Sequence, residues 1–478
     1  MNPAINKADE LRRGQNLIIL TGPDVAVPDG ILSRSEVDYI LAQSEGNKKE
    51  NFSFDRLGHW IMVMIIKGGK ESYKLMESCR KAGDSAINFL NDQKAETVMI
   101  HSDDVYREEI LAFAEGVLLG SYRFSKYKTS EERLFYINEV SVHCDAVSKS
   151  DLEELRVLSA SVFRCRDLIN EPNSYLTASV FAGEVEKMAR EAGVKVESLN
   201  KQKIESLKMG GLLGTNKGSF EPPVFMILEW KPENAVNQRP YVLVGKGVMY
   251  DTGGMNLKPG DSMVNMKDDM SGAAAVAMAL IAVARAKLPV HVISLIPATD
   301  NRPGPEAIVS GDILMMHNRM TVEVVNTDAE GRLILADALS YAKKFDPMLV
   351  IDLATLTGSA FRAVGKYGIV SVQQDADEEL RDLQVSGWRT YERIVDFPNW
   401  EEYGELIKSD VADLKNIGPA EGGAITAGKF LQNFISFPHI HLDIAGPAFL
   451  TKKDSYRGNG GTGVGVRLLF DFLKRRAV

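Results

Sequence analysis

The segment "TVEVVNTDAEGRLILADAL", residues 321–339, decides how the second half of the chain is expected to fold. Its first five residues are β-branched and apolar apart from Glu323, which favours a buried strand, and its last seven residues read as a helix. Between them, Asp328, Glu330 and Arg332 crowd the turn. The segment therefore predicts a strand, a turn and a helix, with charge gathered at the edge of the core.

Apolar runs and helical segments alternate on both sides of this segment. The runs that suit strands are Val224–Leu228, Tyr241–Val244, Val290–Ile296, Val322–Val325 and Met348–Leu353. An alanine-rich helix is expected at Gly272–Lys287, where small side chains allow close packing on a sheet. Because several of the strands are nearly all apolar, the sheet should be covered on both faces. We expect an α/β/α domain with a mixed, mainly parallel sheet over residues 151–478, entered through an amphipathic helix at Asp151–Asn170.

The first 150 residues also alternate strands and helices, which predicts a smaller N-terminal α/β domain. Its expected strands are Leu17–Leu20, Ile61–Ile66, Thr97–Ile100, Phe135–Ile137 and Val140–Val142, and its expected helices are Glu71–Asn91 and Arg107–Leu119. This region carries no group of His, Cys or acidic residues at the spacing of metal ligands. We therefore interpret it as a scaffold or assembly domain.

Composition excludes several classes of protein. With 45% hydrophobic and 25% charged residues, the 478-residue chain is typical of a globular protein of about two domains. The net charge of -9 argues against nucleic acid as the main partner, and no apolar run is long enough for a membrane span. The start of the chain does not read as a signal peptide, and three cysteines far apart do not predict a disulfide framework. A cytoplasmic location is expected.

A second charged stretch, "VGKGVMYDTGGMNLKPGDSMVNMKDDM" at residues 244–270, follows the expected strand 241–244. Lys246 lies between two glycines, Asp251 precedes Thr-Gly-Gly, Lys258 precedes Pro-Gly, and Asp269 opens the alanine-rich helix. Each has an ordinary structural explanation, such as a turn residue or a charge at a helix end. Ligand sites form outside the carboxyl ends of strands in such sheets, so these loops could instead converge with residues 328–332 on one pocket.

Carboxylates held close together resist ionisation unless a cation lies between them, and a divalent metal ion removes the conflict. A dication beside Lys246 would lower the pKa of the ammonium group and allow the neutral amine to bind. Oxygen ligands with one nitrogen suit Zn, Mn, Mg or Co without choosing among them. The sequence offers no His-Glu-x-x-His motif, and we interpret His317, His439 and His441 as core or surface residues.

"NTDAEGRL", with "VGKGVMYDTGG" before it and "DLATLTG" at residues 352–358 after it, resembles the leucyl aminopeptidases, the di-metal cytosol aminopeptidase family (peptidase family M17). The spacing agrees as well, since Lys258 precedes Asp269 by eleven positions. Further similar segments are "GGAITAGKFL" (422–431), "HLDIAGPAF" (441–449) and "GTGVGVRLL" (461–469). The resemblance covers most of residues 170–478, whereas the N-terminal region matches only in size and α/β character.

The resemblance implies two divalent metal ions per subunit, Zn or Mn, with Mg or Co as alternatives. Lys246, Asp251, Asp269 and Glu330 would hold the more readily exchanged ion, and Asp251, Asp328 and Glu330 would hold the other. Lys258 would act on the scissile carbonyl or the bridging oxygen, and Arg332 would bind a bicarbonate ion that serves as general base. Met266, Thr355 and Gly358 would line the pocket for the first side chain, and the backbone at Leu356 would contact substrate.

The resemblance therefore implies an aminopeptidase that removes leucine or similar apolar residues from peptides with a free N-terminus, and a homohexameric assembly. Three other functions are less well supported by the sequence. Another di-metal hydrolase, such as a phosphoesterase, usually uses His and Asp ligands, and the lysine ligand and the NTDAEGRL motif argue against it. A DNA-binding role is disfavoured because the sequence shows no stripe of basic residues. Nucleotide binding at Gly245-Lys246-Gly247 fails because the glycine spacing of a P-loop is missing.

Overall fold

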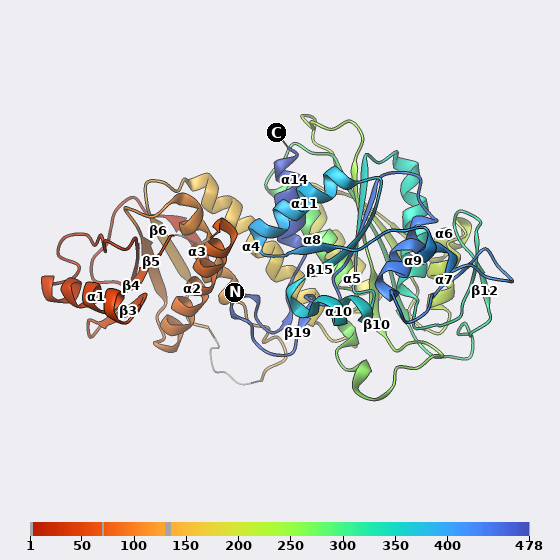
Figure 1. The fold of residues 1–478 in the computed structure, drawn as a ribbon, viewed down its shortest axis with the longest axis horizontal. Coiled ribbons are helices and arrows are strands. Elements are labelled where there is room, and N and C mark those ends of the chain that lie inside the picture. The colour runs from red at the N-terminus through yellow and green to blue at the C-terminus, as the bar shows by residue number, and fades with distance from the viewer. Residues whose placement is uncertain (1–2, 69–70, 130–134, 478) are drawn as a thin grey trace. The chain divides into compact units, whose positions relative to one another are not determined.

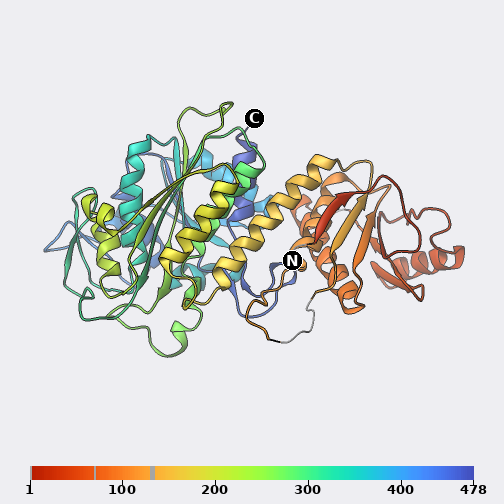
Figure 2. The same ribbon diagram turned by 180° about the vertical axis from the view of Figure 1, so that it is seen from behind.

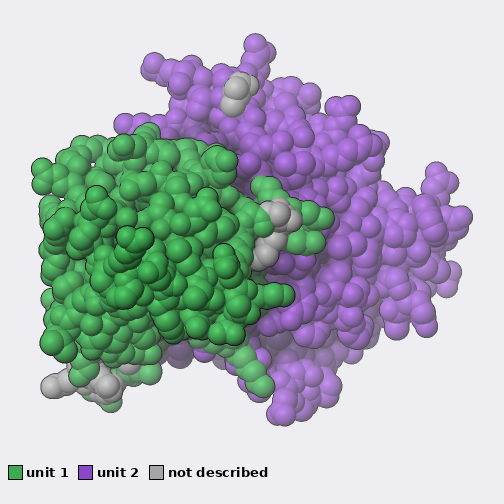
Figure 3. All heavy atoms as spheres, turned by 60° about the vertical axis from the view of Figure 1, so that its left-hand side comes forward, with its two compact units in different colours: residues 1–163, 452–458 green, residues 164–451, 459–478 purple. Residues whose placement is uncertain are grey.

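The computed structural model describes residues 3–68, 71–129 and 135–477. The chain divides into two compact units, which Figure 3 colours separately. Unit 1 comprises Met1–Phe163 and Lys452–Gly458, and unit 2 comprises Arg164–Thr451 and Asn459–Val478. The division falls inside helix α4 (Lys149–Asn170), the amphipathic helix expected from the sequence. The domain boundary after residue 150 stays a prediction.

Unit 1 is built on a six-stranded sheet. The strands follow the order β1 (Ala4–Lys7), β6 (Glu139–His143), β5 (Thr97–His101), β2 (Leu17–Thr21), β4 (Trp60–Ile65) and β3 (Asn51–Asp55). Neighbours are parallel except for β3 and β4. The helices are α1 (Arg34–Gly46), α2 (Ser72–Asp92) and α3 (Arg107–Gly120), and buried residues of α2 and α3 share a core cluster with the sheet. The expected smaller α/β domain is confirmed.

One expected strand of unit 1 is wrong. Residues 135–138 form no strand, because β6 begins pairing with β5 only at Glu139, opposite Thr97. Ile137 is nevertheless buried and Phe135 packs against the same core cluster. The apolar run at 135–137 therefore reflects burial of side chains and not strand pairing.

Unit 2 contains a nine-stranded mixed sheet. Eight strands follow the order β16 (Ile394–Asp396), β15 (Ile369–Gln374), β18 (His439–Asp443), β14 (Leu349–Ala354), β9 (Tyr241–Gly245), β11 (Val292–Asn301), β8 (Val224–Trp230) and β7 (Lys195–Leu199), and β10 (Gly247–Asp251) pairs with β11. The central strands β18, β14, β9 and β11 are parallel, and antiparallel pairs occur at β15–β18, β11–β8 and β8–β7. The predicted fold class, α/β with mixed, mainly parallel sheets, is confirmed.

Helices cover both faces of this sheet, as Figures 1 and 2 show. Helix α8 (Ser271–Arg285), which is buried over fourteen residues, packs on β9, β11 and β14 and against α14 (Val466–Arg475). Apolar residues of α9 (Gly331–Ala342) and α13 (Gly423–Gln432) instead share a core cluster with alternate residues of β9 and β11. The remaining helices are α5 (Ala178–Glu191), α6 (Lys201–Ser206), α7 (Gly210–Asn216), α10 (Gly358–Val364), α11 (Asp377–Thr390) and α12 (Glu402–Glu405).

The strand expected at residues 322–325 is shorter than predicted and belongs to another sheet. Strand β13 (Thr321–Glu323) pairs with β12 (Ile313–Met315) and β17 (Leu414–Lys415) in a separate three-stranded sheet. It ends at Glu323 because the following backbone turns to other partners, with the Val325 N–H donating to the Asn416 side chain at 2.8 Å. Helix α9, which packs on the main sheet, therefore positions the turn at residues 326–330, and the preceding strand β13 does not.

No helix in the described ranges combines the length and apolar character that a bilayer span requires.

Candidate active site

Glycines bring the two charged segments into contact. Lys246 joins β9 to β10, and a Cβ atom at Gly245 would come within 2.6 Å of the backbone of α8 at Ala273. A Cβ atom at Gly331 would lie 2.4 Å from Cε of Lys246. Because a side chain fits at neither position, the glycines allow α8 and α9 to approach the lysine closely. Asp251 then ends β10, beside β11, and faces the turn that precedes α9.

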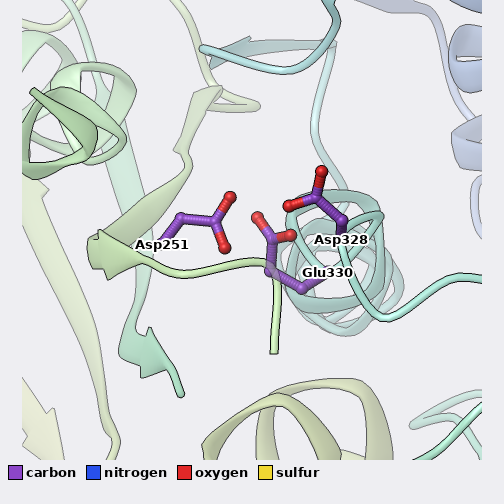
Figure 4. A group of neighbouring side chains, drawn as sticks. All are labelled: Asp251, Asp328 and Glu330. Atoms are coloured by element: carbon purple, nitrogen blue, oxygen red, sulfur yellow. The ribbon is translucent and has the colours of Figure 1, made fainter. Parts of the chain in front are cut away.

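Three carboxylates converge at this point. Asp251, Asp328 and Glu330 each offer an oxygen atom that lies within 4.8 Å of the others, and Figure 4 shows the side chains pointing toward one another. Asp251 and Glu330 are buried, whereas the Asp328 side chain is 32% exposed. Ionised carboxylates this close repel one another unless cations lie nearby, and two lysine side chains provide that positive charge.

Lys246 and Lys258 are those cations. Lys258 Nζ lies 2.7 Å from Asp251 Oδ2 and 2.7 Å from Asp328 Oδ1. Lys246 Nζ donates to Asp269 Oδ1 at 2.7 Å and lies 3.0 Å from Glu330 Oε1. The two ammonium groups therefore bind the three converging carboxylates and also a fourth acid, Asp269.

Burial and mutual charge shift the pKa values of this cluster. Burial alone would lower the pKa of both lysines, but the carboxylates around them, Asp269 for Lys246 and Asp251 for Lys258, outweigh it and hold each pKa above its ordinary value. Burial raises the pKa of Asp269, and burial together with the charge of Asp251 raises the pKa values of Asp328 and Glu330. Because burial and mutual repulsion disfavour the ionised acids, binding of an additional cation beside them would be favourable.

Asp269 shows the clearest opening for such a cation. It lies between the 3-10 helix at Met266–Asp268 and α8, with its side chain only 6% exposed. Its Oδ1 accepts from Lys246 and, at 2.8 Å, from the Thr355 hydroxyl. Its Oδ2 is buried without a hydrogen-bond partner among the described residues. An unsatisfied buried carboxylate oxygen is costly, which fits an atom meant to bind a ligand.

Asn301 is a residue of this site that the sequence analysis missed. Its buried side-chain amide donates to Asp251 Oδ1 at 2.8 Å, to the Thr327 carbonyl at 3.1 Å and to Glu330 Oε2 at 3.3 Å. The amide therefore fixes the orientation of two carboxylates from different elements. No local signal marks it, because it ends β11, fifty residues after Asp251.

Arg332 lies in the first turn of α9 with its guanidinium group buried. Nε and Nη1 have no hydrogen-bond partner among the described residues. Burial lowers the pKa of Arg332 to about 10, although the charges of Glu330 and Asp443 oppose this, so the group stays cationic at neutral pH. A buried cation with two unused donors is suited to an anion.

The four acids, the two lysines and Arg332 open onto one cavity of about 770 Å³. The predicted site residues that line it are Lys246, Asp251, Lys258, Met266, Asp269, Asp328, Glu330, Arg332, Thr355, Leu356 and Gly358. The structure thus brings every predicted site residue to the same cavity.

The cavity wall at residues 355–358 is held by Asp443, which the sequence analysis did not single out. Its carboxylate accepts from the Thr357 hydroxyl at 2.7 Å, the Leu356 N–H at 3.2 Å and the Ala445 N–H at 3.1 Å. Because Asp443 ends β18 and residues 355–357 follow β14, the neighbouring strand, this carboxylate ties the loop to the sheet.

The histidines lie away from the cavity, as interpreted. His439 Nε2 and His441 Nδ1 each lie 2.7 Å from an oxygen of Asp352, and all three side chains are fully buried in the sheet. His317 is half-buried and its Nδ1 contacts the Leu207 carbonyl at 2.7 Å.

Comparison with known proteins agrees with this fold. Residues 163–470 match the model of the cytosol aminopeptidase family catalytic domain, and residues 63–131 match the model of its N-terminal domain. A probable cytosol aminopeptidase of Chlorobium limicola is 44% identical over 474 residues, covering 96% of this chain and 89% of that protein. One of Chlorobium phaeobacteroides is 45% identical over 379 residues, covering 76% of this chain and 75% of that protein.

Two solved structures share the fold over nearly the whole chain. A mutant of tomato leucine aminopeptidase superposes with a TM-score of 0.86 at 28% identity, covering 99% of this chain and 96% of that one. The bottromycin maturation enzyme BotP, in complex with Mn, superposes with a TM-score of 0.85 at 28% identity, covering 97% of this chain and 100% of that one.

The two-domain α/β fold and the family models together define the class: the chain belongs to the cytosol aminopeptidase family. Its activity is accordingly that of an aminopeptidase, a hydrolase that acts as an exopeptidase.

A first prediction concerns the cavity wall. Replacing Asp443 with asparagine places an amide N–H₂ group against hydrogen-bond donors, so the loop at 355–358 should shift. We expect kcat/KM for an aminopeptidase substrate to fall about tenfold or more, since small displacements of substrate-positioning groups are costly. Steady-state kinetics on the metal-loaded variant check this. Asp410→Asn, the same change at an exposed position of unit 2, should be neutral; equal kinetics for Asp443→Asn and wild type would refute the role of Asp443.

Proposed function

We propose that the protein is a two-metal aminopeptidase that releases leucine or another apolar residue from peptides with a free N-terminus. The observation that carries the proposal is the convergence of Asp251, Asp328 and Glu330 within 4.8 Å of one another at the wall of the cavity. The Mn complex of BotP and the leucine aminopeptidase of tomato, both similar over nearly the whole chain, support it.

The donor set fits divalent metal ions. The ammonium groups of Lys246 and Lys258 stand in for the positive charge that bound ions would bring to the four acids. The free Oδ2 of Asp269 leaves one buried oxygen ready to bind. Carboxylate oxygens with one amine nitrogen suit Zn or Mn, with Mg or Co as alternatives.

We assign the ligands as follows. Lys246, as a neutral amine, Asp251, Asp269 and Glu330 would hold the more exchangeable ion, and Asp251, Asp328 and Glu330 would hold the second, with Asp251 and Glu330 shared. Asn301 supports this assignment because it donates to both shared carboxylates and so limits their rotation.

When bound, two such ions supply Lewis-acid chemistry and a water molecule of lowered pKa. Lys258, which keeps its proton, would face the negative charge that develops on the scissile carbonyl oxygen. Arg332 would hold a bicarbonate ion through its two unused donors, and a bicarbonate bound there would supply a general base beside the metal site. Met266, Thr355 and Gly358 would surround the first side chain, and the backbone at Leu356 would bind the substrate main chain.

We also propose that the protein works in the cytoplasm on short peptides and assembles as a homohexamer. Restricted access to an inner cavity would limit substrates to short peptides and unfolded N-termini.

Metal dependence is the test of the proposed function. Chelation should abolish hydrolysis of leucine p-nitroanilide, and dialysis into bicarbonate buffer with Zn, Mn, Co or Mg should restore it. The N-acetylated substrate, measured in parallel, should stay intact because it lacks the free amine. Hydrolysis that survives exhaustive chelation, with metal analysis showing an empty site, would contradict the two-metal proposal.

A further inference from the structure

One cationic side chain at the cavity has no role in the metal site. Arg362 lies one turn after Gly358 in helix α10, and both residues line the cavity. A Cβ atom built on Gly358 would lie 3.2 Å from Nη1 of Arg362 and 3.9 Å from its Cζ. The guanidinium group therefore lies directly over the glycine that we propose to line the pocket for the first side chain.

The guanidinium group of Arg362 has no anionic partner. No ion pair or hydrogen bond of this side chain is found among residues 3–68, 71–129 and 135–477, and the residue is exposed. The other cations of the cavity differ, because Lys246 and Lys258 are bound to carboxylates and Arg332 is buried. Arg362 is thus a cation that faces the substrate space with its donors unused.

A guanidinium group offers paired N–H donors that match both oxygens of a carboxylate. Its flat face and aliphatic stem can also pack against an apolar side chain, so its position is compatible with leucine. The paired donors are not needed at a pocket that serves apolar residues alone.

We propose that Arg362 extends the substrates of this site to peptides whose N-terminal residue is glutamate or aspartate, with the side-chain carboxylate bound by the guanidinium group. The reaction is the same peptide hydrolysis, and the inference rests on the proposed function of the cavity. Arg362 is a specificity-determining residue in this scheme and takes no part in the chemical step.

The test compares substrates that differ in charge alone. The metal-loaded enzyme is assayed with the p-nitroanilides of glutamate and glutamine, and the ratio of their kcat/KM values is taken. This ratio cancels any change that affects both substrates equally. Arg362→Met should lower it about tenfold, the effect of losing a charge-assisted hydrogen bond in a partly hydrated site. Arg362→Lys, which keeps the charge without the paired donors, should give a smaller decrease.

Arg381 supplies the matched control, since it is an exposed arginine of helix α11 that does not line the cavity. Arg381→Met should leave the ratio unchanged. Added salt should raise KM for the glutamate substrate in the wild type and much less in Arg362→Met, because it screens the charge pair.

Leucine p-nitroanilide separates failure of this inference from failure of the proposed function. Leucine hydrolysis with a glutamate-to-glutamine ratio that is the same in Arg362→Met and wild type would overturn the role of Arg362 alone. A folded, metal-loaded enzyme that cleaves none of the three substrates would overturn both. A ratio that falls in Arg362→Met but not in Arg381→Met supports the inference.

Discussion

Replacement of Lys258 by alanine is expected to lower kcat for leucine p-nitroanilide by about 10²–10³, with little loss of bound metal, the scale of losing one donor that stabilises developing charge. Its ammonium group lies 2.7 Å from both Asp251 and Asp328, and their charges outweigh its burial and keep its pKa above the ordinary value. In the proposed two-metal site the ions would neutralise those acids, and the ammonium group would be free to face the carbonyl oxygen of the substrate. Its loss should therefore act on the transition state and not on assembly of the site.

Kinetics and metal analysis on the same preparation distinguish these effects. Lys217→Ala, which removes an exposed lysine of unit 2, should change neither quantity. A Lys258→Ala enzyme with near-normal kcat would remove this residue from the mechanism. A variant that loses metal in proportion to activity would place Lys258 in the metal site instead.

The central strands of the main sheet were the most predictable part of the fold. Tyr241–Gly245 and Leu349–Ala354 form strands within one residue of the expected ranges. Each pairs with a neighbour on both edges and is covered on both faces, so nearly every residue must be apolar. In such strands the apolar composition alone predicts a central strand that is covered on both faces.

Strands that depend on distant partners were less predictable. Strand β18 has the sequence "HIHLD", which looks polar, yet it is fully buried. Its two histidines can be buried because Asp352 on the adjacent strand is hydrogen-bonded to both imidazole rings. Strand β13 lies in a small sheet whose partner β17 comes ninety residues later. Local apolar patterns cannot reveal which sheet a three-residue strand will join.

The same division applies to the site. Asp251, Asp328 and Glu330 stand in motifs that follow expected strands, so their convergence could be anticipated from the sequence. Asn301 and Asp443 act on partners from about thirty to ninety residues away, through hydrogen bonds that only the folded sheet creates. The residues that we propose as metal ligands carried a signal in the sequence, whereas the residues that orient them did not.

Replacement of Asp352 by alanine is expected to lower the free energy of unfolding by about 3–5 kcal/mol, the usual cost of breaking a buried charge pair from one side. Asp352 is fully buried between His439 and His441, each 2.7 Å from one of its oxygens. Burial alone would raise the pKa of Asp352, but the charge and hydrogen bonds of the two histidines lower it overall. Without the carboxylate, both imidazole rings would lie in the sheet with their polar atoms unsatisfied.

The effect should depend on pH in a defined direction. The pKa of Asp352 is lower in the folded protein than in the unfolded chain. Its stabilisation of the fold is therefore complete when the pH is above the unfolded-state pKa, and it is lost as the pH falls through the folded-state pKa. Burial would lower the pKa of His441, but Asp352 raises it overall. The stabilisation that comes from protonated His441 is therefore complete below about pH 6.5, and it is lost as the pH rises through the pKa of His441 in the folded protein. The difference between wild type and Asp352→Ala in urea unfolding should therefore be largest between about pH 4 and 6.5. Glu405→Ala breaks an exposed ion pair with Lys408 and should cost less than about 1 kcal/mol at any pH. If Asp352→Ala were as stable as that control, the buried cluster would contribute nothing to the sheet, and the polar residues of β18 would need another explanation.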